Sequence, residues 1–242
     1  MLISLPSSFH SLPDRTTLIW ISIGSTQVNQ TGDLASLNYL TKEQVALLPN
    51  LLTLRNTLYS DEFRAFLRAV TGCGPISGSK QDMSVNTYKK GCYLLNHDDV
   101  IGTRRVSYIL YMPLPYGKPW KPEYGGALEL YPVVSGTAEP QPTPTKSIPP
   151  SWNQFIFFEV QPGRSHHSVE EVVVDEGLDG YQRLSISGWF HAAQPGEPGY
   201  VEEDKDAKMK STREQLVRFP PPLRLSRLFT IGCSNSIQPP YL

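Results

Sequence analysis

The sequence has few of the features that mark several common classes of protein. Its three cysteines, Cys73, Cys92 and Cys233, are too scattered for a disulfide scaffold and show no Cys-x-x-Cys spacing for a zinc site. The formal net charge is −1, so bulk attraction to nucleic acid or to an anionic membrane is not expected. The apolar stretch from Leu18 to Ile23 is too short to span a bilayer. We therefore expect neither a signal peptide nor a membrane anchor, and recognition of any partner by a local site.

Helical patterns dominate the chain before residue 72. Thr41 followed by Gln44 is a capping-box pattern, and apolar residues continue at near-helical spacing as far as Leu52. A second helix is predicted to begin after Ser60, which is a favourable N-cap, and to end at Gly72. The apolar side chains of this second helix recur on one face, so we expect that face to pack against a sheet.

From residue 84 the pattern changes to short segments rich in β-branched and aromatic residues, separated by glycine or proline. No long helical pattern separates these segments, which argues against the alternating helices and strands of a parallel sheet. The predicted fold is mostly β with N-terminal helices, an antiparallel jelly roll covered on one side by the helices. The predicted strands are Val106–Met112, Ala127–Tyr131, Phe155–Val160, Ser168–Val174 and Arg183–Phe190.

Three segments fall outside this pattern. Residues Pro132–Pro150 are too rich in proline for a sheet or helix and are predicted to form an extended surface loop between two strands. Residues 201–218 carry charges of both signs and are predicted to form an exposed helix. Residues 219–242 contain prolines, few charges and no convincing period, so we expect a poorly ordered tail.

The most informative feature is a set of potential metal ligands. His97, Asp98 and Asp99 are consecutive, and a pair of histidines, His166 and His167, follows far downstream. In an extended chain alternate side chains point the same way, so His97 and Asp99 would share one side and Asp98 would face the other. Two histidines and one carboxylate on one face of an octahedron leave three positions open, as expected for non-haem Fe(II). Spacing alone does not decide between His166 and His167.

Arg183 completes this set. It begins a predicted strand, and Ser185 lies two residues later on the same face, so a guanidinium and a hydroxyl are expected to point into the interior together. A guanidinium binds a carboxylate in a planar bidentate geometry that lysine cannot reproduce. A small dicarboxylate that chelates iron at one end and meets Arg183 at the other would satisfy both groups. Taken singly, these residues could be surface histidines and an exposed strand arginine; their joint order is much rarer by chance.

Longer stretches around these residues resemble a known family. The segments YKKGCYLLNHDDVIGTRRVSYILYMP, YGGALELY and RLSISGWFH, with the segment from Thr31 to Gly78, are similar to the catalytic domain of the 2-oxoglutarate- and Fe(II)-dependent ribosomal prolyl hydroxylases. These are the prolyl 3-hydroxylases associated with translation termination. The resemblance covers roughly Gln27 to Pro198.

The resemblance implies a double-stranded β-helix, the jelly-roll barrel of the 2-oxoglutarate oxygenases. It also implies that iron is bound by His97, Asp99 and His167, the last because HSVEEV matches the family's pattern with His167 leading. Arg183 would then hold the far carboxylate of 2-oxoglutarate.

Tyr88 and Tyr111 match tyrosines that line the cosubstrate pocket in this family, and Ser185 is expected to join them there. Tyrosine hydroxyls in such a pocket can donate to the carboxylate. Ordinary aromatic packing in the core is the alternative for both tyrosines. Asp98 is expected to have a structural or substrate-facing role.

The family's reaction hydroxylates a prolyl residue of a small-subunit ribosomal protein and converts 2-oxoglutarate to succinate and carbon dioxide. The resemblance therefore implies Fe(II), 2-oxoglutarate, O2 and L-ascorbate as cofactors and a ribosomal protein as partner, with no direct binding of nucleic acid or membrane. It also implies a location in the nucleus, the cytoplasm or both.

The expected domains are an atypical N-terminal segment over residues 1–26, the catalytic domain over 27–200, and a charged segment and tail over 201–242, with the family's second barrel missing. The junction between Val174 and Gly180 is longer than is usual in the family. The alternative function is that of a truncated, catalytically silent fragment that acts as a binding or regulatory module. A non-redox, cupin-like metal protein is a third interpretation, which Arg183 and Ser185 make less favourable.

Overall fold

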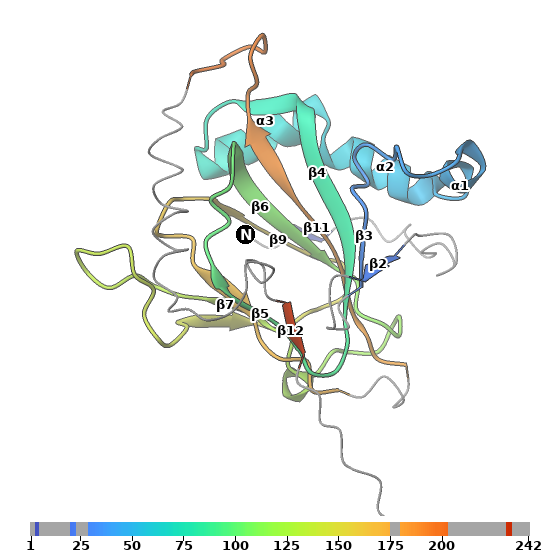
Figure 1. Ribbon diagram of the computed structural model, residues 1–242, viewed down its shortest axis with the longest axis vertical. Helices are drawn as coiled ribbons and strands as arrows, with labels where there is room; N and C mark the ends of the chain where they lie inside the picture. Colours follow the sequence, from blue (N-terminus) through green and yellow to red (C-terminus); the bar gives the residue numbers. More distant parts are fainter. Residues whose placement is uncertain (1–2, 5–19, 23–28, 175–179, 203–230, 234–242) are drawn as a thin grey trace, which may run out of the picture.

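The computed structural model describes residues 3–4, 20–22, 29–174, 180–202 and 231–233, and within them two antiparallel sheets and a layer of helices (Figure 1). The larger sheet has the strand order β1 (Ile3–Ser4), β9 (Gln154–Glu159), β6 (Arg104–Tyr111), β11 (Arg183–Ala192), β4 (Ile76–Tyr88), β3 (Asn29–Thr31) and β2 (Trp20–Ser22). The smaller sheet has the order β12 (Ile231–Cys233), β5 (Cys92–His97), β10 (His167–Val169), β7 (Leu128–Leu130) and β8 (Lys146–Ile148). The prediction of a mostly β, antiparallel fold with few helices is confirmed.

The first helical region begins as predicted but is not one helix. Thr41 and Gln44 form the capping box, with the backbone N–H of each bonded to the side chain of the other. The chain then forms α1 (Lys42–Ala46) and α2 (Pro49–Leu58), so the predicted continuous run to Leu52 is wrong. Pro49 explains the break, because proline disfavours helical geometry in the residue before it and is well suited to the first turn of a new helix.

The helix α3 (Asp61–Thr71) agrees with the prediction at both ends. The Ser60 hydroxyl accepts a hydrogen bond from the backbone N–H of Phe63, and Gly72 ends the helix with a φ of 74°. Residues with a side chain rarely adopt this left-handed backbone conformation, which explains the glycine at this position. A short 3-10 helix, η1 (Pro122–Tyr124), lies in the connection before β7.

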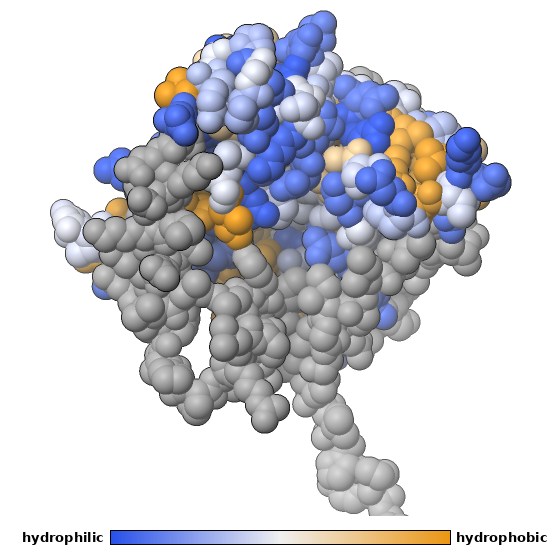
Figure 2. Space-filling model, turned by 45° about the horizontal axis from the view of Figure 1, so that its top comes forward, coloured by the Kyte–Doolittle hydropathy of each residue, from blue (hydrophilic) through white to orange (hydrophobic). Residues whose placement is uncertain are grey.

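The helices cover one face of the larger sheet (Figure 1). Side chains alternate along β11, and Leu184, Ile186 and Phe190 belong to the same buried apolar cluster as Leu58 and Leu67 of the helices. Seen from the helical side, the outer surface is mostly hydrophilic (Figure 2), as expected for helices whose apolar face is buried. Among the described residues, none of the helices is long and apolar enough to cross a membrane.

The other face of the larger sheet packs against the smaller sheet. Tyr111 of β6, Ile156 of β9 and Leu128 of β7 form a separate buried cluster between the two sheets. The alternate residues of β11 that begin with Arg183 and Ser185 point into this space, and these two are almost completely buried. The central strand β11 therefore separates an apolar core under the helices from a more polar interior between the sheets.

Some predictions for individual segments need correction. The predicted strand over Ser168–Val174 ends at Val169. Beyond it, Glu170 donates its N–H to the carbonyl of Ala127 and Val172 donates to that of Cys92, so the chain stays between β7 and β5 without forming a regular ladder. The predicted loop over Pro132–Pro150 contains β8, which pairs with β7. Of the predicted helix over 201–218, residues 201–202 are not helical and the rest lies outside the described residues, as does the predicted tail over 219–242 apart from β12.

Glu197 joins the turn after β11 to the beginning of β4. One carboxylate oxygen accepts hydrogen bonds from the backbone N–H groups of Gly78 and Ser79 at 3.0 Å each, and the other accepts from Gln194 at 2.6 Å. Burial opposes ionisation of this carboxyl, but the hydrogen bonds outweigh it and lower the pKa of Glu197 to about 2.

We expect the Glu197→Gln variant to be less stable than wild type at pH 7, because the hydrogen bonds favour the ionised carboxylate. The folded-state pKa of about 2 lies below the ordinary value of 4.5, so this stabilisation is present above about pH 4.5 and is lost as the pH falls toward 2. Urea unfolding at pH 7, 4.5 and 3.5 should show the difference between the two proteins shrinking below pH 4.5. A constant difference would contradict the assignment.

The Leu67→Ala variant tests the packing of α3 on the sheet. Leu67 is 0% exposed, so its truncation should lower the free energy of unfolding by about 2–5 kcal/mol. Val70, on the same helix, is 44% exposed, and Val70→Ala should change it by less than about 0.5 kcal/mol. Equal losses in chemical denaturation would show that α3 does not pack as described.

Candidate metal centre

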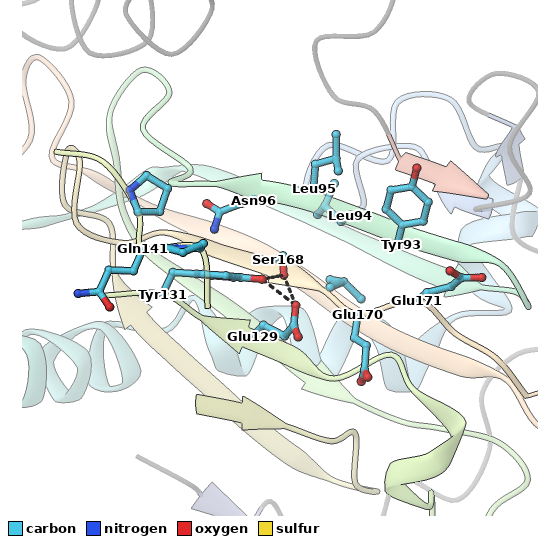
Figure 3. Close-up of a pocket in the computed structure, with 13 residues that line it drawn as sticks. Tyr93, Leu94, Leu95, Asn96, Glu129, Tyr131, Gln141, Ser168, Glu170 and Glu171 are labelled. Atoms are coloured by element: carbon cyan, nitrogen blue, oxygen red, sulfur yellow. Dashed lines mark hydrogen bonds between the residues drawn. The ribbon is translucent and has the colours of Figure 1, made fainter. Parts of the chain in front are cut away.

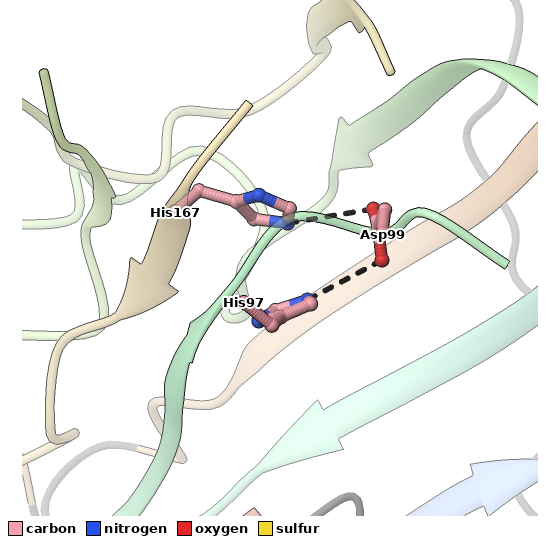
Figure 4. Close-up of side chains that lie close together, drawn as sticks. All are labelled: His97, Asp99 and His167. Atoms are coloured by element: carbon pink, nitrogen blue, oxygen red, sulfur yellow. Dashed lines mark ion pairs between the residues drawn. The ribbon is translucent and has the colours of Figure 1, made fainter. Parts of the chain in front are cut away.

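His97, Asp99 and His167 lie together between the two sheets (Figure 4). His97 ends β5 and His167 begins β10, and the two residues are paired directly across the antiparallel ladder. Nε2 of His97 lies 3.3 Å from Oδ1 of Asp99, and Nε2 of His167 lies 3.4 Å from Oδ2. The candidate ligand atoms all lie within 4.8 Å of one another, so a single metal ion could bind all three.

Asp99 reaches this position by a route that differs from the prediction. The expected extended conformation through Asp99 is wrong, because its φ is 61°, in the left-handed region. Asp98 points elsewhere: its carboxylate accepts hydrogen bonds from the backbone N–H groups of Val100 at 3.2 Å and Gly163 at 3.1 Å. Asp98 thus holds the loops around the site rather than facing a metal.

Both imidazoles are oriented by backbone carbonyls. Nδ1 of His97 lies 2.8 Å from the carbonyl oxygen of Leu95, and Nδ1 of His167 lies 2.8 Å from that of Ser165. A carbonyl can only accept, so each Nδ1 carries the proton and donates it. The lone pair of each Nε2 is then directed at the space beside Asp99, which is the tautomer that a metal ligand requires.

His166 points to the other side of its strand. Its Nε2 lies 3.0 Å from the carbonyl oxygen of Ala138 and its side chain is buried. Adjacent residues of an extended chain face opposite sides. The structure therefore places His167, and not His166, beside Asp99.

The charges of this group are mutually dependent. Burial alone would lower the pKa of His97, but the nearby negative charge of Asp99 raises it above the usual value. Burial likewise opposes ionisation of Asp99, but its attraction to His167 and His97 holds its pKa well below the usual range. Asp99 is thus an ionised carboxylate. The side chain of His97 is 24% exposed, so a ligand could reach the centre from this side.

Arg183 lies in the same interior, close to two tyrosines. It is paired with Tyr88 on β4, and Ser185 is paired with Tyr111 on β6. Its Nε donates to the carbonyl oxygen of Gly126 at 2.6 Å, and one terminal nitrogen donates to the Tyr111 hydroxyl at 3.1 Å. The guanidinium carbon lies 4.5 Å from the ring centre of Tyr88 and 5.1 Å from that of Tyr111.

This arginine is a buried cation without an anion. Arg183 is 1% exposed, and no carboxylate among the described residues forms an ion pair with it. The Tyr88 and Ser185 hydroxyls also lack a hydrogen-bond partner within the described part of the chain. Burying an unpaired charge is costly, so this arrangement favours an anionic ligand with several hydrogen-bond acceptors.

Gly126 makes room for the arginine. A Cβ atom there would lie 2.7 Å from Cδ of Arg183 and 3.0 Å from a methyl of Val172, and the φ of Gly126 is 71°. Both observations require glycine. The YGGALELY segment thus has a physical role, because its second glycine lets the backbone carbonyl approach the guanidinium.

Two residues that the sequence interpretation missed contact Asp99. The Ser107 hydroxyl on β6 donates to Oδ2 at 2.6 Å, and Nε1 of Trp189 on β11 donates to the same oxygen at 3.0 Å. Trp189 could have been found, because it follows Arg183 by an even number of residues and so shares its face of β11. Ser107 has no comparable signal, since its role depends on the register between strands.

A hollow of about 590 Å³ lies on the face of the smaller sheet that points away from the metal centre. Glu129, Tyr131 and Ser168 point into it and are joined by hydrogen bonds (Figure 3). Ser168 directly follows His167, so their side chains face opposite sides of β10. This hollow is therefore separate from the metal centre.

A family model described as the 2OG-Fe(II) oxygenase superfamily matches residues 83–191, which include every residue of the centre. The part of the chain that carries the centre is thus similar to this superfamily. It is 48% identical over 168 residues to prolyl 3,4-dihydroxylase OGFOD1 of Ostreococcus tauri, and 39% identical over 150 residues to prolyl 3-hydroxylase OGFOD1 of Mus musculus. These matches cover 69% and 62% of this chain.

The chain spans 31% and 25% of the lengths of these two relatives. Among solved structures, it is similar to a prolyl 4-hydroxylase of Phytophthora capsici, at 18% identity and a TM-score of 0.48, over 78% of this chain and 57% of that one. It is also similar to a prolyl 4-hydroxylase of Pseudomonas putida, at 22% identity and a TM-score of 0.39, over 72% of this chain and 70% of that one.

Neighbouring histidines provide a matched test of the centre. His167→Ala should weaken binding of Mn(II), a redox-stable substitute for Fe(II), by more than the roughly 10–100-fold loss caused by removing an outer partner of a metal ligand. His166→Ala removes a hydrogen bond of similar length on the other side of the strand and should leave Mn(II) affinity unchanged. Isothermal titration calorimetry measures both, and equal affinity in the two variants would exclude His167 as a ligand.

Proposed function

We propose that this chain is a 2-oxoglutarate- and Fe(II)-dependent dioxygenase that hydroxylates a prolyl residue. One observation carries the proposal: a buried group of two histidines and one aspartate shares its interior with a buried arginine that has no anionic partner. The first group suits a metal ion with open coordination positions, and the second suits a carboxylate. A single ligand, 2-oxoglutarate, has the functional groups to meet both.

The fold supports the same assignment. The two facing antiparallel sheets are consistent with the double-stranded β-helix, or jelly-roll barrel, of this superfamily. In that arrangement the interior between the sheets is the active site, and the helices support the larger sheet from outside. The observed division of β11 into an apolar face and a polar face agrees with this assignment.

The ligand atoms fit Fe(II) without rearrangement of the histidine tautomers. Nε2 of His97, Nε2 of His167 and one carboxylate oxygen of Asp99 would hold the ion, and thiolates, which would favour zinc, are not among them. When bound, Fe(II) would allow O2 to oxidise 2-oxoglutarate to succinate and carbon dioxide while one oxygen atom is inserted into a C–H bond of the prolyl ring. The chain's own contribution is to hold both reactants and to limit access of water.

Arg183 and its neighbours would bind the far carboxylate of 2-oxoglutarate. The guanidinium supplies the positive charge, and the hydroxyls of Tyr88, Tyr111 and Ser185 lie on the strands beside it. Burial raises the pKa of Tyr88 and Tyr111, although Arg183 opposes the effect. Both phenols therefore remain protonated and can donate hydrogen bonds to the carboxylate.

The substrate is assigned from the relatives. The curated relatives are named as prolyl hydroxylases, which supports a prolyl residue as the hydroxylated group. A small-subunit ribosomal protein as its source, and L-ascorbate as a reductant that keeps iron in the ferrous state, are further parts of the proposal that rest on the resemblance of the sequence. A location in the nucleus or cytoplasm rests on it as well.

Turnover of 2-oxoglutarate tests the proposal directly. Purified chain with Fe(II), ascorbate and 2-oxoglutarate should produce succinate, and small ribosomal subunits added to the reaction should gain an oxygen atom on a prolyl residue, detected by mass spectrometry of peptides. His97→Ala should abolish both signals. Metal binding without any turnover would instead support the alternative of a silent binding module.

Arg183→Lys separates cosubstrate binding from iron binding. Lysine keeps the charge but loses the planar fork, so affinity for 2-oxoglutarate should fall by about 10–100-fold, equivalent to about 1.5–3 kcal/mol for a charge-assisted contact. Mn(II) affinity should not change. The control Arg55→Lys alters an arginine that bonds the backbone of Leu34 and Ala35 outside the site, and it should affect neither. Unchanged cosubstrate affinity in Arg183→Lys would contradict the assignment.

A further inference from the structure

The two oxygens of the Asp99 carboxylate have different surroundings. Oδ2 accepts hydrogen bonds from the Ser107 hydroxyl at 2.6 Å and from Nε1 of Trp189 at 3.0 Å. Oδ1 has no such donor among the residues that the structure describes; the charged groups beside it are Nε2 of His97 at 3.3 Å and a guanidinium nitrogen of Arg104 at 3.7 Å. The carboxylate is therefore held by one oxygen and open at the other.

The two donors occupy Oδ2 fully. A carboxylate oxygen has two lone-pair sites, and two well-formed hydrogen bonds use both. Nε2 of His167 approaches the same oxygen only to 3.4 Å, beyond the usual length of an N–H···O bond, so it replaces neither donor. From this geometry we infer that Ser107 and Trp189 are positioning residues that make Asp99 bind the metal through Oδ1 alone.

The sheet holds both donors in place. Ser107 and Trp189 are directly paired across the β6–β11 ladder, so the register between these two strands fixes their relative positions. The guanidinium of Arg104 lies over the Trp189 ring, 3.4 Å from its centre, and restrains the orientation of the indole by a cation–π contact. The donors are thus set by backbone register and ring stacking before any ion binds.

Binding through one oxygen matters for the number of open positions. Two histidines and one carboxylate oxygen use three of six octahedral positions and leave three. A cosubstrate that chelates through two atoms, together with O2, needs all three. A carboxylate bound through both oxygens would remove one of them. This inference rests on the iron centre of the proposed function, and it adds the reason why that centre keeps room for both reactants.

The test counts the open positions with Mn(II) as the only added ligand. The water-proton relaxation rate of the Mn(II)-bound protein reports how many exchangeable waters the ion carries. Trp189→Phe keeps a ring under Arg104 but removes the indole N–H, and Ser107→Ala removes the hydroxyl. We expect each variant to lower the number of bound waters, toward a loss of about one third in the double variant as three positions become two.

Trp120→Phe is the matched control. The indole of Trp120 is buried and donates a hydrogen bond of 2.9 Å to the carbonyl oxygen of Gly125, away from Asp99. This variant should lose a comparable hydrogen bond while its Mn(II)-bound waters stay at the wild-type number. Thermal unfolding of each variant verifies that it is folded, and if one is not, the other carries the test.

The outcomes separate this inference from the proposed function. An unchanged number of waters in both Trp189→Phe and Ser107→Ala would overturn it, even if Mn(II) affinity fell by the roughly 10-fold expected for loss of an outer partner. An equal loss of waters in Trp120→Phe would also overturn it. Wild-type protein that binds no Mn(II) would instead overturn the iron centre itself, and the inference with it.

Discussion

The centre depends on strand register more than on any single side chain. The β5–β10 ladder sets His97 opposite His167, and the two ladders of β11 set Arg183 beside Tyr88 and align Trp189 with Ser107. Side chains alternate along a strand, so a slip of one residue would turn each of these groups to the wrong face. The helices pack against the apolar residues of the same β11 strand, and this packing opposes such a slip.

The interior between the sheets holds opposite charges that do not neutralise each other. Asp99 is surrounded by the two histidines, Ser107 and Trp189, while Arg183 is surrounded by tyrosines and a backbone carbonyl. Two separated and incompletely satisfied buried groups reduce the stability of the fold. The apolar core beneath the helices offsets this, so the part of the molecule that stabilises the fold and the part that carries the candidate site lie on opposite faces of one sheet.

Local signals in the sequence were enough for some elements and not for others. The ends of α3 could be predicted because Ser60 and Gly72 act through contacts within a few residues. The strand β4 was missed because its sequence is rich in serine and other polar residues, and its conformation comes from pairing with β3 and β11. The family resemblance pointed to His97, Asp99 and His167 together, whereas the left-handed backbone at Asp99 has no sequence signal, since it is imposed by the surrounding loops.

Ser165, in the loop before β10, links the backbone beside Asp99 to the imidazole of His167. The Ser165 hydroxyl donates to the carbonyl oxygen of Asp98, and the carbonyl of Ser165 accepts from His167. The peptide unit next to Asp99 is thereby connected to the imidazole on the other strand through one residue. These hydrogen bonds arrange the candidate ligands as part of the fold itself, so an ion that bound there would not have to offset the conformational entropy lost in ordering them.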